Sequence, residues 1–199
     1  IMFVYMIFTA IGAGVGHSLV TASLDKNYKD FNALTFIVSW ICGFCISCFY
    51  SLYQPFMKIW VGEKLMFNNI VVMMFCAYFY LYIVCGIFST YKDSAGIWHE
   101  DRYRPLIGAV VNLALNVMFV KTYGVYAILM STIISYLIIN IPWLIYNVFH
   151  LLFKVNPLKY LGRLFVYTCV SLVACYITSL CTRLILIEGL VGLILKLVV

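Results

Sequence analysis

The sequence is poor in charged residues. Only 10% of its 199 residues are Asp, Glu, Lys or Arg, whereas 65% are apolar. Soluble domains carry roughly 25% charged residues, and a soluble chain of the present composition would expose large apolar patches to water. This composition is typical of a protein embedded in a lipid bilayer. The net charge of +6 needs no nucleic-acid partner, because contact with anionic lipid head groups accounts for it.

Catalytic and metal-binding motifs are also missing. The three histidines, His17, His99 and His150, lie far apart, and there is no HExxH, GxSxG or P-loop pattern. All eight cysteines fall within apolar runs, where cysteine behaves as a small apolar residue. The CxxCxxC spacing at 42–48 has no nearby histidine or carboxylate to complete a metal site. We therefore predict a protein that is not an enzyme, with no catalytic residues, no metal and no cofactor.

Long apolar runs dominate the chain. A helix needs about 20 mostly apolar residues to cross a bilayer, and six runs meet this requirement or come close to it. They are residues 1–22, 33–54, 67–89, 105–120, 123–147 and 160–182. The predicted fold class is therefore all-α, a polytopic membrane helix bundle with about six spanning helices over residues 1–182.

The two ends of the sequence suggest a longer protein. The chain begins with Ile1 and stops within apolar sequence at Val199. Residues 183–199 are apolar but hold Glu188 and Lys196, so they predict either an interfacial segment or the start of a seventh span. We expect a fragment of a larger membrane protein, with 183–199 as a truncated apolar segment, and not a signal peptide followed by a domain.

The basic residues are unevenly distributed over the six polar breaks. Successive breaks must lie on opposite sides of the membrane. The first, third and fifth breaks carry eight lysines and arginines, and the other three carry four. Because basic residues concentrate on the cytoplasmic side, we predict that segments 23–32, 90–104 and 148–159 are cytoplasmic.

Proline and glycine predict where helices end, bend and pack. Pro55 is expected to stop the second helix, and Pro142 to kink the fifth. Gly124 follows the fourth run almost directly, which predicts a tight antiparallel hairpin between 105–120 and 123–147. Close approach of another helix is predicted at three glycines of the first run. These are Gly12, Gly14 and Gly16.

The segment 91–105, YKDSAGIWHEDRYRP, holds six charged side chains between two apolar runs. Its basic residues are Lys92, Arg102 and Arg104. They either attract an anionic substrate group at a cytoplasmic entrance, or they orient the protein and form salt bridges with acidic residues of the same segment. Those acidic residues are Asp93, Glu100 and Asp101.

Three amides lie within the predicted spans. Asn112 and Asn116 are four residues apart, on one face of the fourth helix, and Asn140 lies in the fifth run. An amide in hydrocarbon is costly unless it is hydrogen-bonded, so this face should point into the bundle. The amides either bond between helices or line a polar transport cavity, and the sequence leaves both interpretations open.

Three segments share a pattern with one protein family. In residues 88–135 a Lys-Asp-small-small-Gly stretch leads to an acidic-Arg-Tyr-basic-Pro helix start, then to Asn112 and the turn Lys121–Gly124. The segments QPFMKIWVGEK at 54–64 and GHSLVTASLDKNYKDFNAL at 16–34 agree with it. In combination they resemble bacterial polysaccharide flippases of the O-antigen and teichoic-acid type. These belong to the superfamily that also holds multidrug and toxin extruders and lipid II flippases.

The resemblance implies a transporter of the bacterial cytoplasmic membrane, with two six-helix lobes around a cavity that opens alternately to either side. It implies that an undecaprenyl-pyrophosphate-linked oligosaccharide repeat unit is moved to the outer leaflet for polysaccharide export. This chain would be most of the C-terminal lobe. Its partners would be the lipid-linked glycan, the bilayer and the N-terminal lobe of the same protein. Candidates for the substrate path are then Asn112, Asn116 and Asn140 for sugar hydroxyls, with Lys92, Arg102 and Arg104 for the pyrophosphate.

Other functions fit the same composition. A multidrug or cation antiporter, or a lipid II flippase, would belong to the same superfamily. An antiporter needs a membrane-embedded carboxylate, which the five clearest predicted spans lack. A membrane glycan polymerase or glycosyltransferase would need a catalytic cluster, usually in a large outer loop, whereas the longest loop predicted here has about fifteen residues. A scaffold of an export complex is a further alternative.

Overall fold

The computed structural model describes residues 2–184 and residue 196. Within this part the chain is all helical and has no strand. Most of the predicted segment 183–199 lies outside the described residues. The elements, in chain order, are α1 (Met2–Thr21), α2 (Leu24–Trp60), the 3₁₀ turn η1 (Glu63–Leu65), α3 (Asn69–Ser94), α4 (Arg104–Tyr123), α5 (Val125–Ser135), the π-helical η2 (Tyr136–Asn140), α6 (Ile141–Tyr146), the π-helical η3 (Asn147–Phe153) and α7 (Leu158–Leu184).

Five of the described helical stretches are long and apolar enough to cross a membrane. They are Leu24–Trp60, Asn69–Ser94, Arg104–Tyr123, Val125–Phe153 and Leu158–Thr182. The fourth is one continuous helical stretch made of α5, η2, α6 and η3, which we call the rod. The first predicted run, 1–22, corresponds to α1. The prediction of an all-α, multi-pass membrane bundle is thus confirmed at this level.

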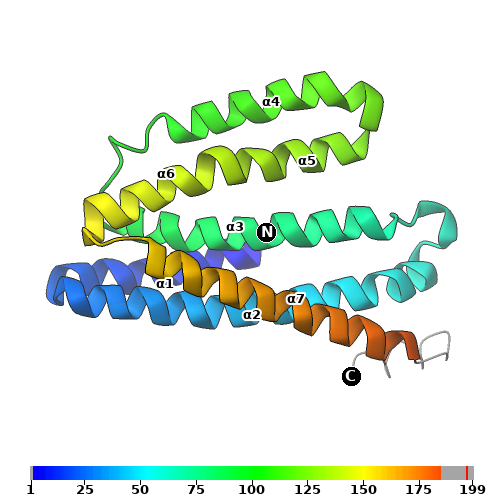
Figure 1. Cartoon of the computed structure of the whole chain (residues 1–199), viewed down its shortest axis with the longest axis horizontal. Helices are drawn as coiled ribbons and strands as arrows, with labels where there is room; N and C mark the ends of the chain where they lie inside the picture. The colour runs from blue at the N-terminus through cyan, green and yellow to red at the C-terminus, as the bar shows by residue number, and fades with distance from the viewer. Residues whose placement is uncertain (1, 185–195, 197–199) are drawn as a thin grey trace.

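The segments predicted to share one side of the membrane do lie together (Figure 1). The α1–α2 turn, the α3–α4 connection and the η3–α7 connection gather at the left end of the view, and the α2–α3 and α4–α5 connections lie at the right end. Segments 23–32, 90–104 and 148–159 therefore occupy one end of the bundle. The charge bias predicts that this end is cytoplasmic, and we call it the basic end.

The α1–α2 turn is tighter than predicted. α2 begins at Leu24, so most of the predicted polar break 23–32 is helical. The buried Asn27 explains this difference, because its amide fills the turn. Its Nδ2 donates to the carbonyls of Ser18 and Ser23 at 3.2 and 3.1 Å, and its Oδ1 accepts from Ser18 Oγ at 2.7 Å. Both carbonyls also accept a backbone hydrogen bond, from the N–H groups of Ala22 and Asn27, so the Asn27 amide adds a second bond at each and ties the end of α1 to the start of α2.

Neither proline acts simply as a helix terminator. The prediction for Pro55 was wrong, because α2 continues through it to Trp60. A proline removes one backbone hydrogen bond, and here that loss falls close to the helix end. Pro142 lies at the start of α6, with the π-helical segments η2 and η3 on either side of that helix. The rod therefore accommodates Pro142 with widened turns on both sides.

Aromatic side chains form the core at the basic end. Phe31 of α2 is fully buried, and five ring centroids lie 4.9–5.9 Å from its own. They belong to Phe88, Tyr91, Phe149, Phe153 and Tyr160. Aromatic pairs at this spacing contribute about 0.5–1.5 kcal/mol each beyond burial. The cluster packs α2, α3, η3 and α7 against one another, next to the start of the α3–α4 connection.

α1 approaches α3 closely, as its glycines predicted. A Cβ at Gly12 would lie 3.7 Å from Thr90 Cγ2, and Ser94 Oγ donates to the Gly12 carbonyl at 3.2 Å. Gly14 instead faces open space. Gly12 and Gly16 thus form the small-residue contact with α3, a packing mode common between membrane helices.

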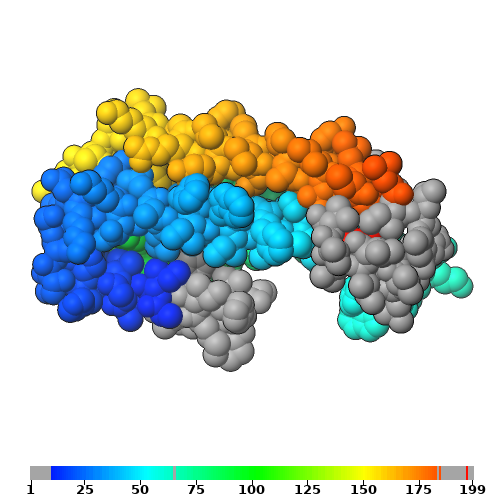
Figure 2. Space-filling view, turned by 90° about the horizontal axis from the view of Figure 1, so that it is seen from below, coloured from blue at the N-terminus to red at the C-terminus, as the bar shows by residue number. Residues whose placement is uncertain are grey.

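α2 and α7 lie side by side (Figure 2) and approach each other closely at Gly43, which yields a stability prediction. A Cβ at Gly43 would lie 2.6 Å from Ser171 Oγ and 3.1 Å from Ser171 Cβ. We expect Gly43→Ala to lower the free energy of unfolding by about 1–3 kcal/mol, because the helices must separate. Thermal unfolding in detergent measures this change. Gly162→Ala on α7 is the control, since a Cβ there meets nothing within 4 Å. Equal stability of the two variants would contradict the prediction.

α4 lies at the edge of the bundle and packs through one face (Figure 1). Four apolar residues of its outer face, Leu106, Val110, Leu113 and Val117, are 58–66% exposed. Gly124, with φ of +56°, forms the predicted tight turn into α5. The outer face is suited to lipid or to another part of the protein. The inner face carries the amides predicted to point into the bundle.

Candidate functional site

The charged segment 91–105 is only partly solvated, because part of it is folded into the bundle while Glu100 and Arg102 stay exposed. α3 continues to Ser94, so Lys92 and Asp93 are helical, and α4 begins at Arg104. Lys92 and Asp101 are each only 4% exposed. The predicted third run ended at residue 89, whereas α3 extends to Ser94, so its last turn carries Lys92 and Asp93.

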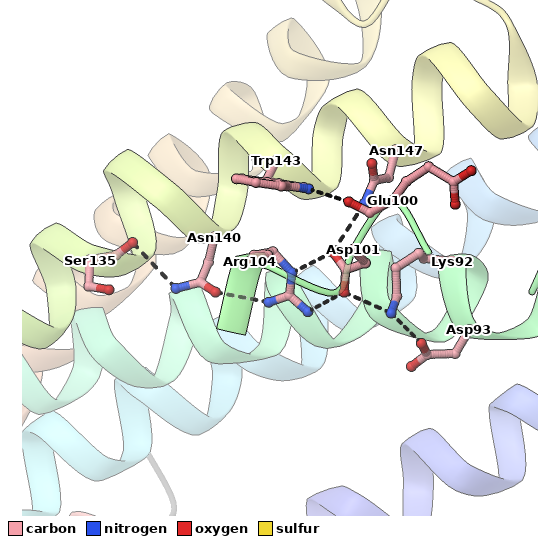
Figure 3. Close-up of polar contacts among 9 residues, drawn as sticks. All are labelled: Lys92, Asp93, Glu100, Asp101, Arg104, Ser135, Asn140, Trp143 and Asn147. Atoms are coloured by element: carbon pink, nitrogen blue, oxygen red, sulfur yellow. Dashed lines mark hydrogen bonds and ion pairs between the residues drawn. The ribbon is translucent and has the colours of Figure 1, made fainter. Parts of the chain in front are cut away.

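Asp101 is the centre of this buried network (Figure 3). Arg104 donates to it through Nε and Nη2, at 2.7 Å to Oδ1 and 2.8 Å to Oδ2. Lys92 Nζ donates to Oδ2 at 2.9 Å. Asn147 Nδ2 donates to Oδ1 at 3.1 Å. Two-pronged contact between a guanidinium and a carboxylate fixes geometry as well as charge, so the position of Arg104 is set by Asp101.

The electrostatic balance keeps Asp101 ionised. Burial raises the pKa of its carboxyl group, but hydrogen bonds from Arg104 and Lys92, together with the positive charge of both, outweigh burial and hold the pKa below its usual range. Lys92 also contacts Asp93 Oδ1 at 2.5 Å and lies over the ring of Trp98, 4.8 Å from its centroid. The cluster of two acids and two bases is therefore neutral as a whole.

The network fastens the α3–α4 connection to both π-helical segments. Arg104 Nη1 donates to Asn140 Oδ1 of η2 at 2.9 Å, and Asn147 belongs to η3. Between them, Trp143 Nε1 donates to the Glu100 carbonyl at 3.1 Å. These contacts lie on both sides of Pro142, so the rod is held at both of its widened turns.

A cavity of about 400 Å³ lies beside the network, between α1, α3, α4 and η2. We call it the Arg104 cavity. Its charged lining residues are Asp93 and Arg104. Further polar groups come from Tyr82, Ser89, Thr90, Ser94, Tyr136 and Asn140. A recess at the end of a membrane bundle that presents one guanidinium, one carboxylate and several hydroxyls can bind a polar or charged ligand.

A second recess, of about 380 Å³, runs along the inner face of α4. We call it the amide recess, since Asn112, Asn116 and Asn140 line it. Asn140 and Tyr136 line both recesses. The two therefore adjoin, and together they form a polar surface from Arg104 towards the middle of α4.

The amides also bond between helices. Asn112 Nδ2 donates to Thr132 Oγ1 at 3.1 Å, and Ser131 Oγ donates to Asn116 Oδ1 at 2.8 Å. Asn116 Nδ2 donates to Asn112 Oδ1 at 2.6 Å. The interhelical interpretation is thus confirmed. The cavity interpretation also fits, because both amides line the recess and are only partly buried.

The predicted site residues divide into two groups. Arg104, Asn112, Asn116 and Asn140 lie along the two recesses. Lys92 is buried in ion pairs, and Arg102 is exposed, stacked 4.5 Å from the ring centroid of Tyr103. The structure does not place these last two residues in either recess.

The predicted salt bridges with acidic residues of the same segment are confirmed, because Lys92 pairs with Asp93 and Asp101, and Arg104 pairs with Asp101. Sequence reasoning missed one residue of the network, Asn147. Asn147 stands inside an apolar run, where an amide signals a buried polar partner, and this signal was available. Within the described residues, no group of three or more His, Cys, Asp or Glu side chains is arranged to hold a metal ion.

Comparison with known proteins gives no family for the chain: no protein-family model, no curated protein and no solved structure matches it.

Proposed function

We propose that the chain is one lobe of a membrane transporter that moves lipid-linked oligosaccharides across the bacterial cytoplasmic membrane, the function that the sequence resemblance implies. The observation that carries the proposal is the polar surface formed by the Arg104 cavity and the amide recess. It runs along helices whose other faces are apolar and exposed.

The chemistry of this surface suits a glycan with a phosphate group. Sugar hydroxyls both donate and accept hydrogen bonds, and so do the amides of Asn112, Asn116 and Asn140. A guanidinium is a strong partner for phosphate oxygens, and Arg104 lies at the basic end, where a substrate from the cytoplasmic leaflet would enter. The lipid tail could stay in the bilayer beside α4, whose outer face is apolar.

A cation antiporter is the second candidate, because Asp93 lines the Arg104 cavity. Antiport of a cationic drug requires a carboxylate within the membrane protein, and the sequence alone offered none in its clear spans. Asp93 is paired with Lys92, however, and Arg104 shares the cavity. The guanidinium in this cavity favours an anionic ligand over a cationic one.

Replacement of Asn116 by leucine tests the transport path. The change removes an amide from the recess but leaves no buried donor unpaired, since Ser131 Oγ also bonds to the Ile128 carbonyl at 2.9 Å. Loss of one substrate hydrogen bond, about 1–1.5 kcal/mol, should slow transport roughly tenfold. The measurement is movement of a fluorescent lipid-linked oligosaccharide in proteoliposomes that contain the full-length protein.

Leu172→Ala on the exposed surface of α7 is the control and should transport at the normal rate. An organic cation in a parallel assay tests the antiporter alternative. If the wild-type protein moves the lipid-linked oligosaccharide no faster than protein-free liposomes, or if Asn116→Leu matches the control, the proposed path is wrong.

A further inference from the structure

Asp93 differs from the other charges of the buried cluster. Asp101 accepts four hydrogen bonds from Arg104, Lys92 and Asn147, and its side chain is only 5% exposed. The Asp93 side chain is 41% exposed and lines the Arg104 cavity. Within the described residues its ion pair is with Lys92. Asp93 is thus the acid of the cluster that a ligand in the cavity would meet.

The charges around the cavity also limit what can bind there. Lys92 and Arg104 balance Asp93 and Asp101, so the empty cluster is neutral. An anion beside Arg104 would add negative charge close to Asp93, which lines the same cavity, and would leave the cluster with a net negative charge. Like charges in one site favour protonation of the weaker acid. Protonation of Asp101 would break hydrogen bonds that its ionised carboxylate accepts. Asp93 accepts fewer such bonds and can therefore take the proton.

Other titratable groups around Asp93 do not offer an equivalent proton site. Tyr82 and Cys85 of α3 and Tyr136 of η2 line the same cavity, but none of them carries a carboxylate that could accept the proton. α1 contributes Gly12, which has no side chain, to the described lining. The remaining charged or titratable groups of the α3–α4 connection are exposed to solvent. They are His99, Glu100, Arg102 and Tyr103.

We infer that the Arg104 cavity binds a phosphate-type oxyanion and that Asp93 takes up one proton when the anion binds. The free N–H groups of Arg104 face the anion, while its other N–H groups stay on Asp101 and Asn140. The proton comes from solvent and converts the Asp93 carboxylate to the neutral acid. When the anion is released, the proton returns to solvent as well. The inference relies on the proposed function only for the source of the anion, the phosphate of a lipid-linked glycan.

Sulfate is a suitable probe, because it does not titrate near neutral pH and any proton taken up must belong to the protein. We expect calorimetric titration of the full-length protein, in buffers of different ionisation enthalpy, to show uptake of about one proton per sulfate bound. The dissociation constant should rise by up to about tenfold per pH unit. Asp93→Asn should bind sulfate with no proton uptake and with little pH dependence, and Asp93→Glu should retain both.

The arms of this experiment separate the possible failures. Competition by micelles that contain phosphatidylglycerol would identify a lipid phosphate as the ligand, and its absence would indicate a soluble anion. The inference is overturned if the folded wild-type protein shows no saturable sulfate binding, if it binds sulfate without proton uptake, or if Asp93→Asn takes up the same proton. The wild-type titration decides the question even if a variant fails to fold. None of these results requires transport, so they are independent of the proteoliposome assay.

Discussion

Replacement of Asp101 by asparagine should lower the free energy of unfolding by about 3–5 kcal/mol, the usual cost of leaving a buried ion pair without one partner. The new amide would keep the shape of the side chain but would face Lys92 and Arg104 without charge. Lys92 would retain Asp93 as a partner, whereas Arg104 would lose both of its charged hydrogen bonds to residue 101. The measurement is the unfolding midpoint of the purified protein in detergent.

Glu100→Gln is the control for this change. It also neutralises an acid of the same connection, but Glu100 is exposed, and isolated surface charges contribute about 0–1 kcal/mol. If Asp101→Asn and Glu100→Gln unfold within about 1 kcal/mol of each other, the network does not hold the connection in place. A double variant, Asp101→Asn with Arg104→Met, should recover part of the loss, because it removes a largely buried cation that has lost both of its charged hydrogen bonds to residue 101.

The pH dependence of stability offers a second measurement on the same variant. The pKa of Asp101 is lowered by folding, so the unfolded state binds the proton more tightly. The stabilisation from this group is therefore fully present above the usual aspartate pKa, about 4, and is lost as the pH falls through the lower pKa of the folded state. The wild-type protein should lose stability over that acidic range, and Asp101→Asn should not share this loss.

The sequence predicts the helices well, because hydropathy alone identifies residues that need a bilayer or a core. It also predicts the interhelical amide contacts once the tight turn at Gly124 is recognised. Asn116 lies eight residues before that glycine and Ser131 seven after it, so an antiparallel hairpin brings the two together. Here local geometry determines a tertiary contact.

The inward fold of segment 91–105 was harder to predict. Charged residues next to apolar runs usually face water, and hydropathy cannot distinguish a solvated loop from a balanced buried network. The available clue was composition: the segment holds three acids and three bases, a set that can neutralise itself. Which acid is buried depends on Asn147, far along the chain, and no local pattern relates the two.

Gly108 should be the position at which a single substitution harms transport most. It is buried where α4 meets the rod, and a Cβ there would lie 3.3 Å from Asn140 Nδ2 and 3.6 Å from Ser135 Oγ. Leucine at this site would displace Asn140 and fill the junction of the two recesses. Overpacking of this kind lowers the free energy of unfolding by about 1–3 kcal/mol. Blocking the junction also removes one or two hydrogen bonds to the substrate, about 1–1.5 kcal/mol each, so we expect transport of the lipid-linked oligosaccharide to fall by roughly 10- to 100-fold.

Gly14→Leu is the matched control, because a Cβ at Gly14 meets nothing within 4 Å, and it should transport normally. Asn140→Ala combined with Gly108→Leu separates a blocked path from a misfolded protein. The smaller side chain makes room for leucine, so the double variant should regain stability, yet transport should stay low because the junction is still filled and its amide is gone. Recovery of both stability and transport would show that Gly108 serves packing alone and that the polar surface does not carry the substrate.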